Sequence, residues 1–147
     1  MIAVDTNLLV YAHRKDSPWH AGAVLCISKL AEGRMAWTIP WPCIHEFLAV
    51  VTHPRTFTTP TSLEAAVDQI EAWLESPSLT LLAEGRGFWD HLATQLVVSR
   101  AAGPVVHDAR VAALCLGHGV AELWSADRDF GRFPDLRVRN PLVGMEA

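Results

Sequence analysis

Short runs of apolar residues alternate along the chain with longer segments in which apolar residues recur every three or four positions. The short runs predict strands, and the longer period predicts amphipathic helices. We expect strands over residues 2–5, 36–39, 79–82, 123–125 and 136–139. We expect helices over residues 6–13, 18–31, 42–52, 61–75, 87–101 and 107–117 or 107–119. This alternation predicts an α/β fold of three layers, in which helices cover both faces of a mostly parallel sheet.

Three helix boundaries carry signals of their own. Ser17 resembles an N-cap residue with Pro18 at the first helical position. Thr61 or Ser62 should cap the helix that follows it. Pro54 cannot continue the helix over 42–52, so the segment that follows it should be a loop.

The composition narrows the class of protein. The 147 residues show no linker or repeat, so we expect a single domain over residues 1–147. Half of the residues are hydrophobic, which is enough for a core, and the formal net charge is −4. That charge argues against tight, non-specific binding of nucleic acid. It does not exclude a nuclease whose carboxylates are covered by metal ions.

The cysteines and the N-terminus indicate the compartment. Cys26, Cys43 and Cys115 form no CxxC pair, and each falls in a helical apolar pattern, which predicts buried, reduced thiols. No segment has the length of a membrane span, and the chain opens with a strand rather than a signal peptide. We therefore expect a cytoplasmic protein with no membrane partner.

The first strand ends in a carboxylate. Ile2, Ala3 and Val4 run directly into Asp5, which precedes Thr-Asn. In an open α/β sheet, ligands bind outside the carboxyl ends of the strands, so Asp5 should stand at the mouth of a site. An Asx turn after the strand is the simpler alternative.

Four further acidic residues are expected at the same edge of the sheet. Asp127 and Asp129 follow a strand, Asp108 opens a helix, and Glu46 lies in the first turns of another. Taken singly, Asp108 could cap its helix, Glu46 could be solvated, and Asp127 with Asp129 could form an ordinary acidic turn. Taken together, they would repel one another without a cation, so the set predicts a metal site.

The residue types favour a hard cation. Carboxylate oxygens suit Mg²⁺ or Mn²⁺, and no group of His and Cys has zinc spacing. Asn7 and Ser125 stand beside the acidic residues, where they could orient a ligand or a water, or merely satisfy the backbone of a turn. His107 is adjacent to Asp108 but should point elsewhere on the helix, in a supporting role.

Four segments, taken in order, carry a resemblance to a known family. They are Val-Asp-Thr-Asn-Leu-Leu at 4–9, Glu46 in its helix, His-Asp-Ala-Arg-Val-Ala-Ala-Leu at 107–114 and Ser-Ala-Asp-Arg-Asp-Phe at 125–130. This set resembles a PIN-domain ribonuclease, and more narrowly the VapC toxin of a type II toxin–antitoxin system. The resemblance covers essentially the whole chain.

The resemblance implies a catalytic and metal-binding quartet formed by Asp5, Glu46, Asp108 and Asp127, with Asp129 as a further acidic position. Glu46 would bind the metal directly or through water. The family is implied to be a Mg²⁺- or Mn²⁺-dependent endoribonuclease that cleaves RNA, often a tRNA or ribosomal RNA. We expect hydrolysis to leave a 3′-hydroxyl and a 5′-phosphate.

The resemblance also implies partners. A cognate VapB-type antitoxin would inhibit the enzyme by inserting a segment near the acidic site, and homodimers are usual. DNA would be contacted only indirectly, through the antitoxin.

A basic stretch follows the acidic residues. Arg128, Arg132, Arg137 and Arg139 could grip RNA phosphates, and ordinary pairing with surface acids is the alternative. A PIN-like module that binds RNA or protein without cleaving is the alternative function. A haloacid-dehalogenase phosphatase would want Asp where Asn7 stands. A phosphoaspartate receiver would want adjacent acids at the first strand's end and a late Lys.

Overall fold

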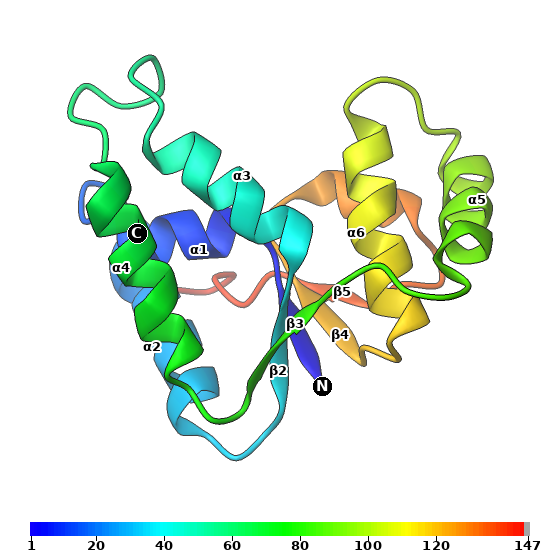
Figure 1. The fold of residues 1–147 in the computed structure, drawn as a ribbon, viewed down its shortest axis with the longest axis horizontal. Helices are drawn as coiled ribbons and strands as arrows, with labels where there is room; N and C mark the ends of the chain where they lie inside the picture. The colour runs from blue at the N-terminus through cyan, green and yellow to red at the C-terminus, as the bar shows by residue number, and fades with distance from the viewer. Residues whose placement is uncertain (146–147) are drawn as a thin grey trace.

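A computed structural model describes residues 1–145 of the chain (Figure 1). Its strands are β1 (Ile2–Val4), β2 (Trp37–Pro40), β3 (Leu79–Leu82), β4 (Glu122–Trp124) and β5 (Val138–Arg139). Its helices are α1 (Thr6–His13), α2 (His20–Glu32), α3 (Trp41–Val51), α4 (Leu63–Leu74), α5 (Phe88–Ser99), α6 (Val105–Gly117) and the 3₁₀ helix η1 (Arg128–Arg132). Strands and helices alternate along the chain, as the apolar pattern predicts.

The five strands form one sheet in the order β3-β2-β1-β4-β5, and each neighbouring pair is parallel. The chain moves outward from β1 through β2 to β3, then returns past β1 to β4. Because crossovers between parallel strands are right-handed, this reversal puts α1–α4 on one face of the sheet and α5 and α6 on the other. Figure 1 shows these two groups of helices on opposite sides of the strands. The predicted α/β fold with a parallel sheet is confirmed.

The reversal also creates a switch point between β1 and β4, where open α/β sheets bind their ligands. The residues of these two strands are anchored in the core. Val4 and Leu123 are fully buried, as are Trp37 and Ile39 of β2. Side chains that directly follow β1 and β4 are therefore held on a rigid base.

One helix begins later than predicted and another begins earlier. α2 starts at His20, because the Ser17 hydroxyl accepts a hydrogen bond from the Trp19 amide at 3.1 Å and the Ser17 carbonyl accepts one from the His20 amide at 3.1 Å. These bonds close a turn before the helix. α6 starts at Val105, so Asp108 lies within the first turn instead of at its start.

The cap of α4 is confirmed at Ser62, whose hydroxyl accepts from the Ala65 amide at 3.2 Å. Cys26, Cys43 and Cys115 are free and buried, as predicted. Over residues 1–145, every helix is too short or too polar to cross a membrane.

Candidate metal centre

A cavity of about 1040 Å³ opens at the carboxyl ends of β1 and β4. Its walls come from α1, α3, α6 and the segment around η1. Five acidic residues line it, and they are the five that the sequence singles out: Asp5, Glu46, Asp108, Asp127 and Asp129. The fold therefore gathers carboxylates from four separate parts of the chain around one space.

Asp5 forms the buried floor of this cavity, with 7% of its surface exposed. It is the N-cap residue of α1, yet its side chain makes no capping hydrogen bond. The carboxylate instead accepts bonds from the Ser125 hydroxyl at 2.7 Å, the Asn7 amide at 3.1 Å and the Cys43 thiol at 3.6 Å. The simple Asx-turn interpretation therefore does not account for Asp5.

Asn7 and Ser125 join the ends of β1 and β4. The Asn7 side-chain nitrogen also donates to the Ser125 hydroxyl at 3.2 Å, and its oxygen accepts from the Ala126 amide at 3.1 Å. The Ser125 hydroxyl in turn accepts from the Asp127 amide at 2.9 Å. These bonds fix Asp5 and the backbone at Asp127 relative to each other.

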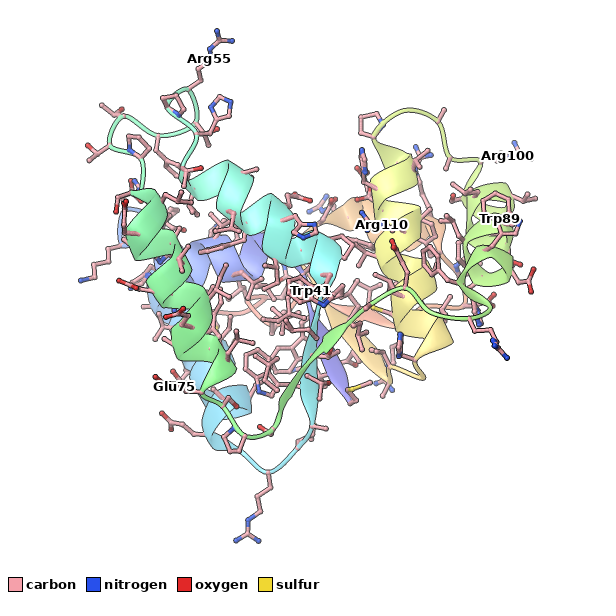
Figure 2. The ribbon with its side chains drawn as sticks, viewed as in Figure 1. Trp41, Arg55, Glu75, Trp89, Arg100 and Arg110 are labelled. Carbon is pink, nitrogen blue, oxygen red and sulfur yellow. The ribbon has the colours of Figure 1, made fainter. Side chains whose placement is uncertain are left out.

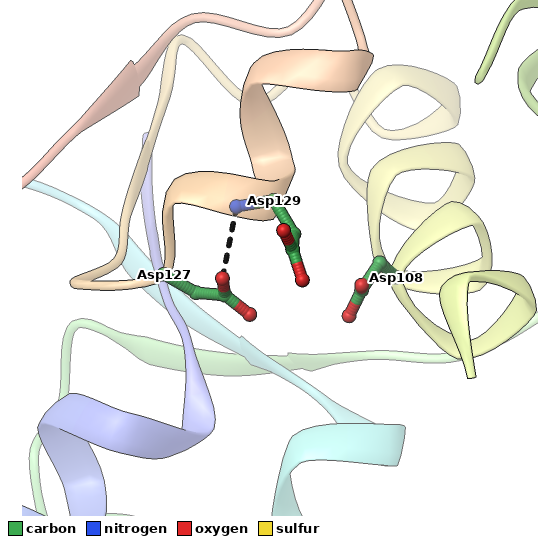
Figure 3. Close-up of side chains that lie close together, drawn as sticks. All are labelled: Asp108, Asp127 and Asp129. Carbon is green, nitrogen blue, oxygen red and sulfur yellow. Dashed lines mark hydrogen bonds between the residues drawn. The ribbon is translucent and has the colours of Figure 1, made fainter.

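Asp108, Asp127 and Asp129 form the most crowded part of the cavity (Figure 3). One carboxylate oxygen from each lies within 4.8 Å of the other two. Asp127 also caps η1, because its carboxylate accepts a hydrogen bond from the Asp129 amide at 2.9 Å. The predicted acidic turn is thus present, and α6 brings a third carboxylate to face it.

Burial and mutual repulsion disfavour negative charge in this cavity. Burial and then the charges of Asp127 and Asp5 raise the pKa of Asp108 from 3.8 to about 6. Burial also raises the pKa of Asp5, although the hydrogen bond from Ser125 opposes that rise. Burial and then Asp5 raise the pKa of Glu46, while His107 lowers it. A bound cation would reverse this penalty.

The donor set fits a hard divalent cation. Oxygens on opposite sides of an octahedral Mg²⁺ lie about 4 Å apart, since each Mg–O bond is about 2.0–2.1 Å. Neighbouring oxygens around such an ion lie closer still, so the three aspartates of Figure 3, which each offer one oxygen within 4.8 Å of the other two, would draw together around a shared cation. Asp5 and Glu46 lie outside this close group but line the same cavity. The acidic cluster is therefore consistent with a metal site.

Three cavity residues were missed or misplaced by the sequence argument. His107 lines the cavity, although we expected it to point elsewhere. His107, Arg110 and Val111 share one face by helical spacing, and Asp108, about 100° further round the helix, also lines the cavity, which therefore covers a wide arc of α6. Arg110 and, on α3, His45 also line the cavity. The spacing of three between His107 and Arg110 was the available signal.

The four arginines of the basic stretch do not form one patch. Arg128 and Arg132 are exposed on η1, beside the acidic residues. Arg137 forms an ion pair of 3.0 Å with Glu122, at the starting ends of β4 and β5. Arg139 is exposed at the other end of β5. Arg137 is therefore paired with a surface acid, as the alternative interpretation expects.

The parallel sheet and the acidic residues at its switch point define a class of protein. A family model described as "PIN domain" matches residues 2–136, so the chain belongs to the PIN domain family. Within it, the chain belongs with the VapC ribonucleases. It is 34% identical over 140 residues to ribonuclease VapC48 of Mycobacterium tuberculosis, covering 95% of this chain and 97% of that protein. It is 38% identical over 144 residues to ribonuclease VapC43 of the same species, covering 98% and 97%.

Solved structures share the fold at lower identity. VapBC2 from Rickettsia felis, described as bound to a DNA fragment from its promoter, matches with a TM-score of 0.66 at 19% identity, covering 95% of this chain and 98% of that chain. VapC20 of Mycobacterium tuberculosis, described as a Sarcin-Ricin loop cleaving toxin, matches with a TM-score of 0.66 at 16% identity, covering 89% and 93%. The recognition of a PIN-domain VapC toxin from the sequence is confirmed.

Proposed function

We propose that the chain is the metal-dependent endoribonuclease toxin of a VapBC-type toxin–antitoxin pair. It hydrolyses an RNA phosphodiester, of a tRNA or ribosomal RNA, and leaves a 3′-hydroxyl and a 5′-phosphate. The observation that carries this proposal is the meeting of Asp108, Asp127 and Asp129 within 4.8 Å at the switch point of the sheet. The similarity to VapC48 and VapC43, both described as ribonucleases, supports the proposal.

In this proposal, Asp5, Asp108 and Asp127 hold Mg²⁺ or Mn²⁺, Glu46 binds it directly or through water, and Asp129 is a further ligand. A bound divalent cation supplies Lewis acidity, which offsets the negative charge on the phosphodiester and makes water easier to deprotonate. The chain's own residues hold the carboxylates in position for the reaction. Asp5 is held in place by hydrogen bonds and needs no rearrangement when substrate arrives.

The remaining polar residues orient the reaction. Asn7 and Ser125 keep Asp5 and Asp127 aligned for in-line attack on phosphorus. Arg128 and Arg132 on η1 contact phosphates on either side of the cleaved bond. Arg139 extends this contact, and Arg137 joins it only if RNA draws it away from Glu122.

A cognate antitoxin inhibits the enzyme by placing a segment near the acidic cavity, and the toxin acts as a cytoplasmic homodimer. The structural similarity to VapBC2 supports the antitoxin partner. DNA is contacted through the antitoxin, since the toxin's own net charge of −4 opposes direct binding.

Cleavage of total bacterial RNA by the purified chain tests this proposal. Wild type, Asp127→Asn and the exposed control Asp90→Asn are compared in Mg²⁺, Mn²⁺ and a chelator, and new 5′ ends are mapped by sequencing. We expect discrete fragments with 5′-phosphates from wild type and Asp90→Asn, and none from Asp127→Asn or with the chelator. Folded, antitoxin-free wild type that leaves RNA intact with both metals would instead favour a PIN-like binding module.

A further inference from the structure

One wall of the acidic cavity is a stripe along α3. The residues of α3 that line the cavity recur at intervals of three and four, which places them on one helical face: Pro42, His45, Glu46, Ala49 and Val50. Trp41 stands one turn before His45, and the two rings lie 5.9 Å apart between centroids at 39°. Trp41 therefore lies on the flank of this stripe, next to His45 and outside the residues that line the cavity.

Trp41 is an exposed tryptophan on a restricted backbone. It is 41% exposed, whereas Trp37 and Trp73 are buried in the core. It is the first residue of α3, directly after β2, so it stands at the edge of the sheet where the carboxylates gather. Pro40 and Pro42 flank it and restrict the backbone on both sides. The fold thus presents an indole ring in a fixed position beside the cavity.

The facing wall carries a guanidinium group that is paired with a carboxylate. Arg110 of α6 lines the cavity and pairs with Glu84, which leaves its guanidinium partly exposed. Figure 2 shows Trp41 at the start of α3 and Arg110 across from it on α6. An aromatic face together with a nearby guanidinium is the chemistry that binds unstacked bases of single-stranded RNA.

We propose that a nucleobase flanking the cleaved phosphodiester leaves its own stack and lies on the indole of Trp41, beside His45. The ring would select single-stranded over duplex RNA, because only an unpaired base can reach it. This inference rests on the proposed function for its substrate. It adds a specificity-determining residue outside the acidic set.

Binding of 12-nucleotide oligoadenylate and oligouridylate tests the proposal. The full chain carries Asp127→Asn so that RNA is not cut in Mg²⁺, and Trp41→Ala, Trp41→Phe and Trp89→Ala are compared in that background. Trp89 is the matched control, because it is 67% exposed on α5 and lies well away from Trp41 in Figure 2. We expect Trp41→Ala to weaken binding by about 10-fold or more, while Trp89→Ala leaves it unchanged.

The phenylalanine variant separates stacking from a general structural effect. Trp41→Phe keeps a ring, so it should retain most of the affinity and lose most of the RNA-induced quenching of tryptophan fluorescence. Equal affinity of the Trp41→Ala and Trp89→Ala proteins would overturn the proposal. So would full quenching in Trp41→Phe. Melting curves confirm that each variant is folded.

Cleavage by otherwise wild-type protein distinguishes the two proposals. If wild type and Trp41→Ala cut the mapped RNA with the same KM and kcat, base stacking is wrong and the nuclease stands. If RNA quenches Trp41 but wild type cuts nothing with Mg²⁺ or Mn²⁺, the nuclease is wrong and the RNA-stacking surface stands.

Discussion

The floor and the mouth of the acidic cavity hold their carboxylates in different ways. At the floor, Asp5 is buried and accepts hydrogen bonds from Ser125, Asn7 and Cys43. The mouth is the crowded group of Asp108, Asp127 and Asp129. There, Asp108 accepts no side-chain hydrogen bond within residues 1–145, and its pKa is raised to about 6. The protein itself solvates the floor carboxylate, whereas the mouth carboxylates face one another.

Carboxylates therefore have two different environments in this cavity. The floor is ordered by the fold alone, because β1 and β4 are neighbours and their ends are tied together. The mouth brings α6 and η1 together against electrostatic repulsion, which a bound cation would offset. Asp127 belongs to both parts, since Ser125 holds its amide and its carboxylate belongs to the crowded group.

The largest effect should follow neutralisation of the floor. We expect Asp5→Asn to lower the cleavage rate by about 100-fold or more, because it removes a preorganised charge at the reacting centre. Initial rates on the mapped RNA in Mg²⁺ measure this, with Asp90→Asn as the exposed control. An Asp5→Asn protein that cuts as fast as wild type would remove Asp5 from the metal site.

Removing the hydrogen bonds that join the floor to the mouth should reduce cleavage less than neutralising Asp5 does. Ser125→Ala removes the donor to Asp5 and the acceptor for the Asp127 amide, both in a buried place. We expect the free energy of unfolding to fall by about 1–3 kcal/mol, with cleavage reduced less than in Asp5→Asn. Urea unfolding measures the change, and Ser28→Ala on α2 is the control.

A double-mutant cycle with Asn7→Ala shows whether the two side chains act as a unit. Coupling beyond the error of the single mutants supports a shared network. Strictly additive losses would mean that Asn7 and Ser125 stabilise the turn independently, and the floor would not be one preorganised unit.

Neutralising a carboxylate at the mouth should stabilise the metal-free protein, whereas Ser125→Ala destabilises it. The folded-state pKa of Asp108 is raised from 3.8 to about 6, so the folded protein binds this proton more tightly than the unfolded chain does. The metal-free protein therefore loses stability from this group as pH rises from about 4 through 6, and does not regain it above. Asp108→Asn should raise the melting temperature by a few degrees at pH 7 in a chelator, with little effect near pH 4.

Added metal sharpens this test. Mg²⁺ or Mn²⁺ should raise the melting temperature of wild type more than that of Asp108→Asn, because the cation binds only the folded site. Melting temperatures between pH 4 and pH 8, with and without metal, measure both effects. A less stable Asp108→Asn protein at pH 7 in chelator would show that repulsion at the mouth is unimportant.

The floor was easier to predict from the sequence than the mouth. An apolar run that ends in Asp5 places a carboxylate at a strand end whatever the order of the strands. That Asp5 would meet Ser125 depends on β1 and β4 being neighbours, and periodicity alone does not order strands within a sheet. The resemblance to the PIN family implied that Asp5 and Asp127 belong to one site, and the structure supplies the strand order that makes β1 and β4 neighbours.

The residues that were missed depend on the phase of a helix. His107, Asp108 and Arg110 all line the cavity, and how wide an arc of α6 faces it depends on how the helix packs rather than on the apolar pattern. The exposure of Trp41 does not follow from the apolar pattern, because it depends on what the packing of α3 leaves uncovered. That residues 1–147 form a single domain stays a prediction.

The smallest effect concerns the basic residues at the mouth. Arg132 is exposed on η1, whereas Arg137 pairs with Glu122 at the far ends of the strands. If Arg132 contacts one phosphate, Arg132→Ala should reduce the slope of log K against log salt by about 0.7, the value for one contact on a single strand. Arg137→Ala should leave the slope unchanged, because Arg137 lies at the starting ends of β4 and β5, distant from the cavity. Salt titrations of RNA binding in the Asp127→Asn background measure both slopes. Equal slopes for the two variants would mean that Arg132 contacts no RNA phosphate.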